Sequence, residues 1–155
     1  MFLTSCGHAF HSKIRYQVEE GIIFTSAQKN IDNNVGFVFI WGGIIVNSIG
    51  SDGASGYLEL AQTPLDKYER IINPDVSWGS FAVMVPNGYD SWELAPGRMI
   101  SVAWILTRGI NASRPSSGQI APYTYPVLEA MEIRRWGIFK GAGHHPSLNL
   151  EKELP

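Results

Sequence analysis

Apolar positions dominate residues 35–49, which read VGFVFIW, then Gly42-Gly43, then IIVNSI. Two β-rich runs separated by two glycines predict a hairpin, because glycine supplies the positive φ that type I′ and II′ turns require. No charged residue stands between Asp32 and Asp52. We therefore expect both faces of this strand pair to be covered, with the pair at the centre of a β core.

Further apolar runs predict strands on both sides of this centre. Residues 13–19 alternate between apolar and polar side chains, which is typical of a half-exposed strand, and residues 22–25 continue or re-pair it. Residues 127–139 fit a helix beginning at Pro126 about as well as they fit a strand, and the β-rich second half favours a strand. The remaining strand-like runs are 57–62, 78–85 and 99–107.

Turn-forming and helix-capping residues divide these runs. Residues 29–34 form a predicted polar turn, and residues 108–122, rich in Ser, Pro and Gly, are predicted to form a long surface loop. The sequence predicts one helix near 64–72. Thr63 can cap it and Pro64 suits its first position.

Together these elements predict an all-β domain, an antiparallel β-sandwich or jelly-roll-like fold with one short helix near 64–72. We expect an N-terminal arm at 1–12, the sandwich domain at 13–140 and a C-terminal tail at 141–155. The residues expected to form the core are Phe37, Phe39, Trp41, Ile45, Val83, Val102, Trp104 and Leu106.

Composition narrows the kinds of partner that the protein can have. Of the 155 residues, 45% are hydrophobic and 17% are charged, with a formal net charge of −2. The charged fraction is below the roughly 25% of typical soluble domains, which suits a surface partly covered by neighbours. Nucleic acid is not an expected partner, because there is no global positive field to attract it.

Cys6 is the only cysteine, so no disulfide can form within the chain. The run Leu3-Thr4-Ser5-Cys6 resembles a lipoprotein cleavage site, but such a site needs an apolar segment ahead of it and none precedes Leu3 here. We therefore expect a free or buried thiol. No membrane span is expected, since residues 35–49 are shorter than the ~20 apolar residues that a bilayer requires.

Tyr89, Asp90 and Trp92 form the best candidate for a ligand or partner contact. Two aromatic rings beside a carboxylate, following the turn Pro86-Asn87-Gly88, are groups that can bind a glycan. An inward-folded Trp92 is the alternative, because Trp is largely buried on average.

Other constellations give no firm site. His8-x-x-His11 and His144-His145 offer nitrogen ligands, but the sequence marks no third and fourth ligand, so we expect no metal and no cofactor. The glycine-rich loop at 50–56 lacks the Lys-Ser/Thr ending of a phosphate-binding loop. Arg134, Arg135 and Trp136 form a small basic and aromatic patch that favours a strand edge or an interface contact.

No catalytic arrangement is evident, and we expect that the protein is not an enzyme. There is no Gly-x-Ser-x-Gly elbow, and nothing splits the pKa values of neighbouring acids. The acidic residues considered are scattered: Asp52, Asp66, Asp75, Asp90 and Glu93.

The functional prediction therefore rests on assembly. A β domain with few charged residues, whose arm carries Phe2, Leu3 and Phe10, suits a subunit that contacts copies of itself and other subunits. We predict a structural component of a virus or phage particle, either a capsid, decoration or tail protein, located in the virion. The alternative is a carbohydrate-binding β-sandwich module that uses Tyr89, Asp90 and Trp92.

Overall fold

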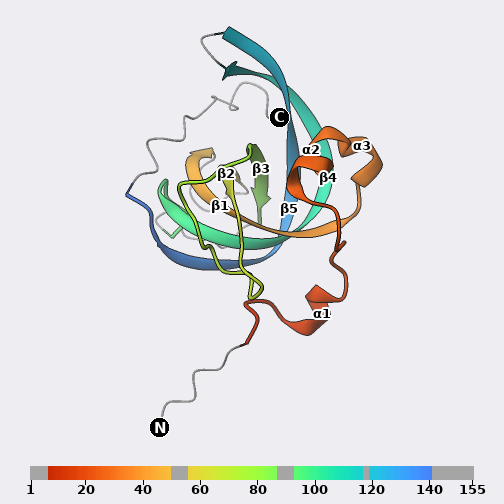
Figure 1. Ribbon diagram of the computed structural model, residues 1–155, viewed down its shortest axis with the longest axis vertical. Helices are drawn as coiled ribbons and strands as arrows, with labels where there is room; N and C mark the ends of the chain where they lie inside the picture. The colour runs from red at the N-terminus through yellow and green to blue at the C-terminus, as the bar shows by residue number, and fades with distance from the viewer. Residues whose placement is uncertain (1–6, 50–55, 87–92, 117–118, 141–155) are drawn as a thin grey trace.

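The structure is a computed structural model that describes residues 7–49, 56–86, 93–116 and 119–140 (Figure 1). Within these ranges, three short helices precede five strands. The helices are α1 (Ser12–Arg15), α2 (Phe24–Lys29) and α3 (Ile31–Asn34). The strands are β1 (Val38–Ile49), β2 (Gly56–Thr63), β3 (Ser80–Val85), β4 (Arg98–Ser116) and β5 (Gln119–Ile138).

The five strands close into a barrel in the order β1-β2-β3-β5-β4, with β4 returning to pair with β1. All pairs are antiparallel except β3 and β5, which run parallel through Ala82↔Val127 and its two neighbours. Strands β1, β2 and β3 are consecutive neighbours, and β4 returns to lie beside β1. This connection is a Greek key, the arrangement found in five-stranded OB-type barrels. The all-β prediction is correct, but the sandwich or jelly-roll prediction is wrong, because one sheet closes on itself instead of two sheets stacking.

Gly42 and Gly43 lie inside β1 and form no turn, so the predicted central hairpin is wrong. A Cβ on Gly42 would lie 2.5 Å from Leu65 Cδ2 and 2.9 Å from the carbonyl oxygen of Thr63. A Cβ on Gly43 would meet Leu60 Cδ2 at 2.9 Å. Glycine is therefore required here for close packing across the strand pair and not for a positive φ.

The predicted loop at 108–122 is also wrong, because these residues form the long hairpin of β4 and β5. This hairpin packs against β3 through buried apolar side chains. Ile110, Tyr125 and Val127 of the hairpin pack with Ala82 of β3. The hydroxyl of Tyr123 donates to the carbonyl of Ser80 at 2.9 Å. The ambiguous stretch 127–139 belongs to β5 up to Ile138, as its β-rich half favoured.

The helices are not where the sequence predicts them. Residues 64–72 contain no helix, because β2 continues to Thr63 and the bridge Leu65↔Ile71 shapes the loop that follows. The predicted strand at 13–19 is instead α1 and a turn, in which only Val18 bridges to the sheet. The predicted strand at 22–25 and turn at 29–34 are replaced by α2 and α3, which pack against β5 and β4.

The barrel interior is filled by aromatic rings. Phe81 and Trp104 meet edge to face at 4.7 Å between centroids, and Phe24 of α2 meets Trp41 in the same way at 5.0 Å. The N-terminal helices therefore contribute to the core as well as the strands do. Seven of the eight predicted core residues are buried, and the exception is Phe37, which is 36% exposed.

Candidate functional site

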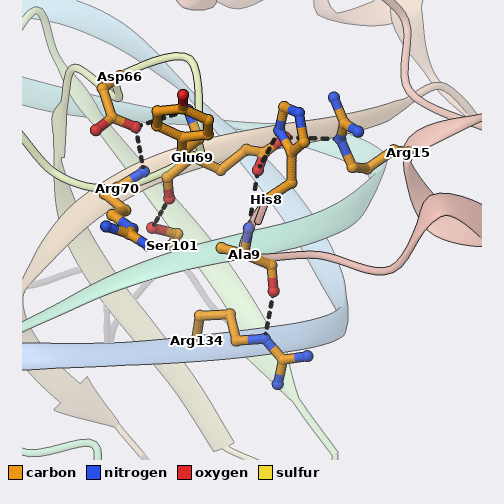
Figure 2. Close-up of polar contacts among 9 residues, drawn as sticks. His8, Ala9, Arg15, Asp66, Glu69, Arg70, Ser101 and Arg134 are labelled. Carbon is orange, nitrogen blue, oxygen red and sulfur yellow. Dashed lines mark hydrogen bonds and ion pairs between the residues drawn. The ribbon is translucent and has the colours of Figure 1, made fainter. Parts of the chain in front are cut away.

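The carboxylate of Glu69 gathers the N-terminal segment onto the barrel (Figure 2). His8 Nδ1 lies 3.1 and 3.2 Å from its two oxygens. The backbone N–H of Ala9 donates to it at 3.1 Å, and Arg15 Nε donates at 2.8 Å. The side chain of Glu69 is only 13% exposed, so these three donors compensate a carboxylate that has lost much of its water.

Glu69 is held in a conformation that few residues with a Cβ adopt. Its φ is +62°, the only positive value at a residue other than glycine in the described ranges. The loop is fixed by Asp66, whose Oδ1 accepts from the backbone N–H of Tyr68 at 2.8 Å and of Arg70 at 3.0 Å. The Arg70 N–H, helped by the Tyr68 N–H, lowers the pKa of the Asp66 carboxyl.

The barrel holds the same segment from a second side. Arg134 Nε on β5 donates to the carbonyl of Ala9 at 2.7 Å, and the Arg134 guanidinium lies 5.9 Å from the ring centroid of the buried Phe10. Arg134 also pairs with Glu132, which lies 3.5 Å from His11 Nδ1. We call residues 8–15, together with Glu69 and Arg134, the N-terminal latch.

Hydrogen bonds connect the latch to the body of the barrel. The indole Nε1 of Trp136 donates to Ser101 Oγ at 2.6 Å, and Ser101 Oγ donates to the carbonyl of Glu69 at 2.7 Å. Ser101 is fully buried on β4. The position of the latch is therefore set by the barrel strands and not by the loop alone.

Two adjoining grooves follow the seam between the N-terminal segment and the barrel. The first, about 250 Å³, lies beside the latch and is lined by Arg15, Val18, Glu20, Ile40, Leu65, Asp66, Lys67 and Glu69. The second, about 320 Å³, shares Val18, Ile40 and Leu65 with it and extends past Phe24 to the exposed Ile23 and Trp78. Both grooves thus surround the place where the N-terminal segment meets the barrel.

Comparison with known proteins identifies the family of this chain. Residues 3–147 match the family described as outer membrane lipoprotein Slp family. The chain belongs to this family. No curated protein matches the chain, and no solved structure matches it.

Membership of the Slp family overturns the functional prediction. The protein is not a virus or phage structural subunit, nor is it a carbohydrate-binding module, and its location is the bacterial outer membrane and not a virion. Few charges and apolar anchors near a terminus suit a surface covered by other subunits, but they suit a protein held at a membrane equally well. Composition does not distinguish these two environments.

Several sequence-predicted site residues of this Slp family member are not among the residues that the structure describes. Tyr89, Asp90 and Trp92 fall outside the described residues, as do His144 and His145. Within the described ranges, no three side chains of His, Cys, Asp or Glu converge as metal ligands would. None of the helices described has the length and apolar character that crossing a bilayer would need.

Sequence patterns point to two residues of the latch but not to Glu69 at its centre. His8 belongs to a histidine pair that could offer nitrogen ligands, and Arg134 to a basic patch that favours an interface contact. In the structure His8 contacts Glu69, and Arg134 contacts the latch segment. No pattern singles out Glu69, because it lies within the predicted helix at 64–72, where an acidic residue carries no special signal. Its distance of 61 positions from His8 hides the contact from any local pattern.

Proposed function

We propose that this Slp family member is a lipid-anchored barrel of the outer membrane in which Cys6 carries the lipid. The observation that supports this most directly is the place of Leu3-Thr4-Ser5-Cys6 in the sequence. Leucine, two small hydroxyl residues and cysteine stand in the order of a lipoprotein cleavage site, within the matched residues 3–147. Only Gly7 separates this cysteine from the first residue of the latch.

The latch suits this role because it binds the segment that follows Cys6 to the barrel. A lipid on Cys6 would act on a segment that Glu69 and Arg134 bind within three residues. A diacyl group supplies two hydrocarbon chains, and two such signals are what stable membrane anchoring needs. The proposed role is not enzymatic.

The low charged fraction of the sequence also predicts that the protein contacts copies of itself. Two copies held in one membrane would meet at high local concentration. Cross-linking of the protein in intact outer membranes would test this prediction independently of the anchor.

The experiment examines Cys6 in the protein purified from bacterial outer membranes. The gene is expressed with a lipoprotein leader joined ahead of Leu3, which supplies the apolar segment that the cleavage site requires. We expect the tryptic peptide of residues 6–13 to carry a diacylglyceryl group and an acyl chain by mass spectrometry. Cys6→Ser should move the protein to the soluble fraction, whereas Ser5→Ala, which keeps a small residue before the cysteine, should leave it membrane-bound.

The proposal fails if the membrane-derived chain carries a free thiol at Cys6. It fails equally if Cys6→Ser leaves the protein in the membrane fraction at the level of the unchanged chain. Either result would mean that another part of the protein makes the membrane attachment.

A further inference from the structure

We infer that the end of the barrel that carries α1 and the loop at 64–72 lies against the lipid surface. In this orientation Tyr16 and Ile72 insert among the lipid headgroups. This inference rests on the proposed anchor at Cys6 and adds to it the orientation of the barrel. The partner is a phospholipid surface, and the contact face consists of residues 12–18 and 64–72.

The reach of the chain restricts which end can face the membrane. Consecutive Cα atoms are 3.8 Å apart, so the three steps from Cys6 to Ala9 span at most about 11 Å. Ala9 is fixed at both its N–H and its carbonyl, by Glu69 and Arg134. A lipid on Cys6 therefore keeps the latch end of the barrel close to the membrane.

Apolar side chains project at this end without protein to cover them. Tyr16, which follows α1, is 90% exposed, and Ile72, in the loop beside it, is 58% exposed. The two segments lie together, because Arg15 and Val18 line the same groove as Lys67 and Glu69. Tyrosine is enriched at membrane interfaces, where the ring contacts lipid and the hydroxyl stays in water.

Exposed cations lie on the same two segments as these side chains. Lys13, Lys67 and Arg70 are exposed. Lys67 and Arg70 also lie 5.1 and 6.0 Å from the ring centroid of Tyr68, and both attract the Asp66 carboxylate. Such groups suit headgroup phosphates. Glu19 and Glu20 are also exposed nearby, so the face is of mixed charge and the apolar pair must supply the main contact.

The opposite end of the molecule differs in kind. The β4–β5 hairpin stands at the top of the long axis in Figure 1, and α1 lies near the bottom. The exposed Asn111 and the polar Thr124 lie along this hairpin, where Thr124 Oγ1 donates to Asn111 Oδ1 at 3.0 Å. The hairpin therefore points away from the membrane in the inferred orientation.

The test supplies the anchor chemically, so that it does not depend on bacterial processing. Cys6, the only cysteine, is coupled in the purified full chain to a maleimide headgroup lipid in vesicles of phosphatidylethanolamine and phosphatidylglycerol. The reference is the same chain capped with N-ethylmaleimide beside uncoupled vesicles. Hydrogen exchange of the backbone amides is then compared by mass spectrometry.

We expect vesicle coupling to slow exchange in residues 12–18 and 64–72 and to leave residues 107–112 unchanged. Tyr16→Ser combined with Ile72→Ser should abolish this slowing. The matched pair Val35→Ser and Met131→Ser removes exposed apolar side chains outside the proposed face and should preserve it. Raising the salt concentration should weaken the slowing in part, through Lys13, Lys67 and Arg70.

Slowed exchange in residues 107–112, or no slowing in residues 12–18 and 64–72, would overturn the inferred orientation. Retention of the slowing in the Tyr16→Ser and Ile72→Ser variant would overturn the assigned contact residues. Failure of the anchor itself has a different signature, a free Cys6 thiol in the membrane-derived protein. The two proposals can therefore fail separately.

Discussion

Arg134 on β5 donates a 2.7 Å hydrogen bond to the carbonyl of Ala9, across 125 positions of sequence. The backbone N–H of Ala9 donates to the carboxylate of Glu69, which lies in the loop between β2 and β3. One residue near the N-terminus is thus held by two distant parts of the barrel. This double hold fixes the backbone of Ala9 on the barrel.

The first prediction concerns Glu69. Glu69→Ala removes the acceptor of three donors and should lower the free energy of unfolding by about 1–3 kcal/mol, since hydrogen bonds to a charged group contribute in this range. The amide of Ala9 should exchange faster. Urea unfolding and hydrogen exchange measure the two effects. Glu129→Ala, which truncates an exposed glutamate on β5, is the control and should change neither. The Ala9 N–H also lies 3.2 Å from the Tyr68 carbonyl, which the variant keeps, so the increase in exchange should be partial. Unchanged exchange at Ala9 together with unchanged stability would show that Glu69 does not hold the segment.

The second prediction concerns the glycine contact inside β1. Gly42→Ala should destabilise the barrel by about 1–3 kcal/mol, because the new methyl group overlaps Leu65 and the Thr63 carbonyl. In Gly137→Ala the new Cβ would lie 3.6 Å from Met99 Cε, an ordinary contact, so the change should stay within about 1 kcal/mol of zero. Thermal unfolding of both variants makes the comparison. Equal stability of the Gly42→Ala and Gly137→Ala variants would mean that the β1–β2 pair has room for a Cβ at residue 42.

The third prediction concerns the aromatic core. Trp104→Ala should cost about 3–5 kcal/mol, because it leaves a cavity beside Phe81. Trp104→Phe should cost less, since the buried indole N–H has no hydrogen-bond partner in the described structure and its removal orphans no other group. Trp78→Ala is the control: the side chain is 58% exposed, and the change should be within about 0.5 kcal/mol. Denaturant unfolding followed by near-UV circular dichroism tests the order of the three.

The fourth prediction concerns pH. Hydrogen bonds from the N–H groups of Arg70 and Tyr68 lower the pKa of Asp66 in the folded protein. A lowered folded pKa stabilises the protein above the ordinary value of about 3.9 and is lost as pH falls through the lower folded value. The Tm of the unchanged chain should therefore exceed that of Asp66→Asn at neutral pH, and the gap should close in acid. A gap that stays constant through the acid range would contradict this assignment.

Local patterns predicted the strands where burial and β propensity agree. Residues 57–62, 78–85 and 99–107 all overlap observed strands, and seven of eight predicted core residues are buried. The errors occur where a local signal had two physical explanations. The glycine pair could mark a turn or a close approach, and Thr63-Pro64 could begin a helix or end a strand.

The sequence by itself determined that the protein is built of strands, because β-branched and aromatic residues recur in uncharged runs whatever their partners are. Only the tertiary structure decided that the sheet closes, since closure depends on β4 pairing with both β1 and β5 and on the parallel contact of β3 with β5. The latch is likewise a tertiary feature. Glu69 meets His8 and Ala9 only because the barrel brings the β2–β3 loop beside the N-terminal segment, and no periodicity records a contact across 61 positions.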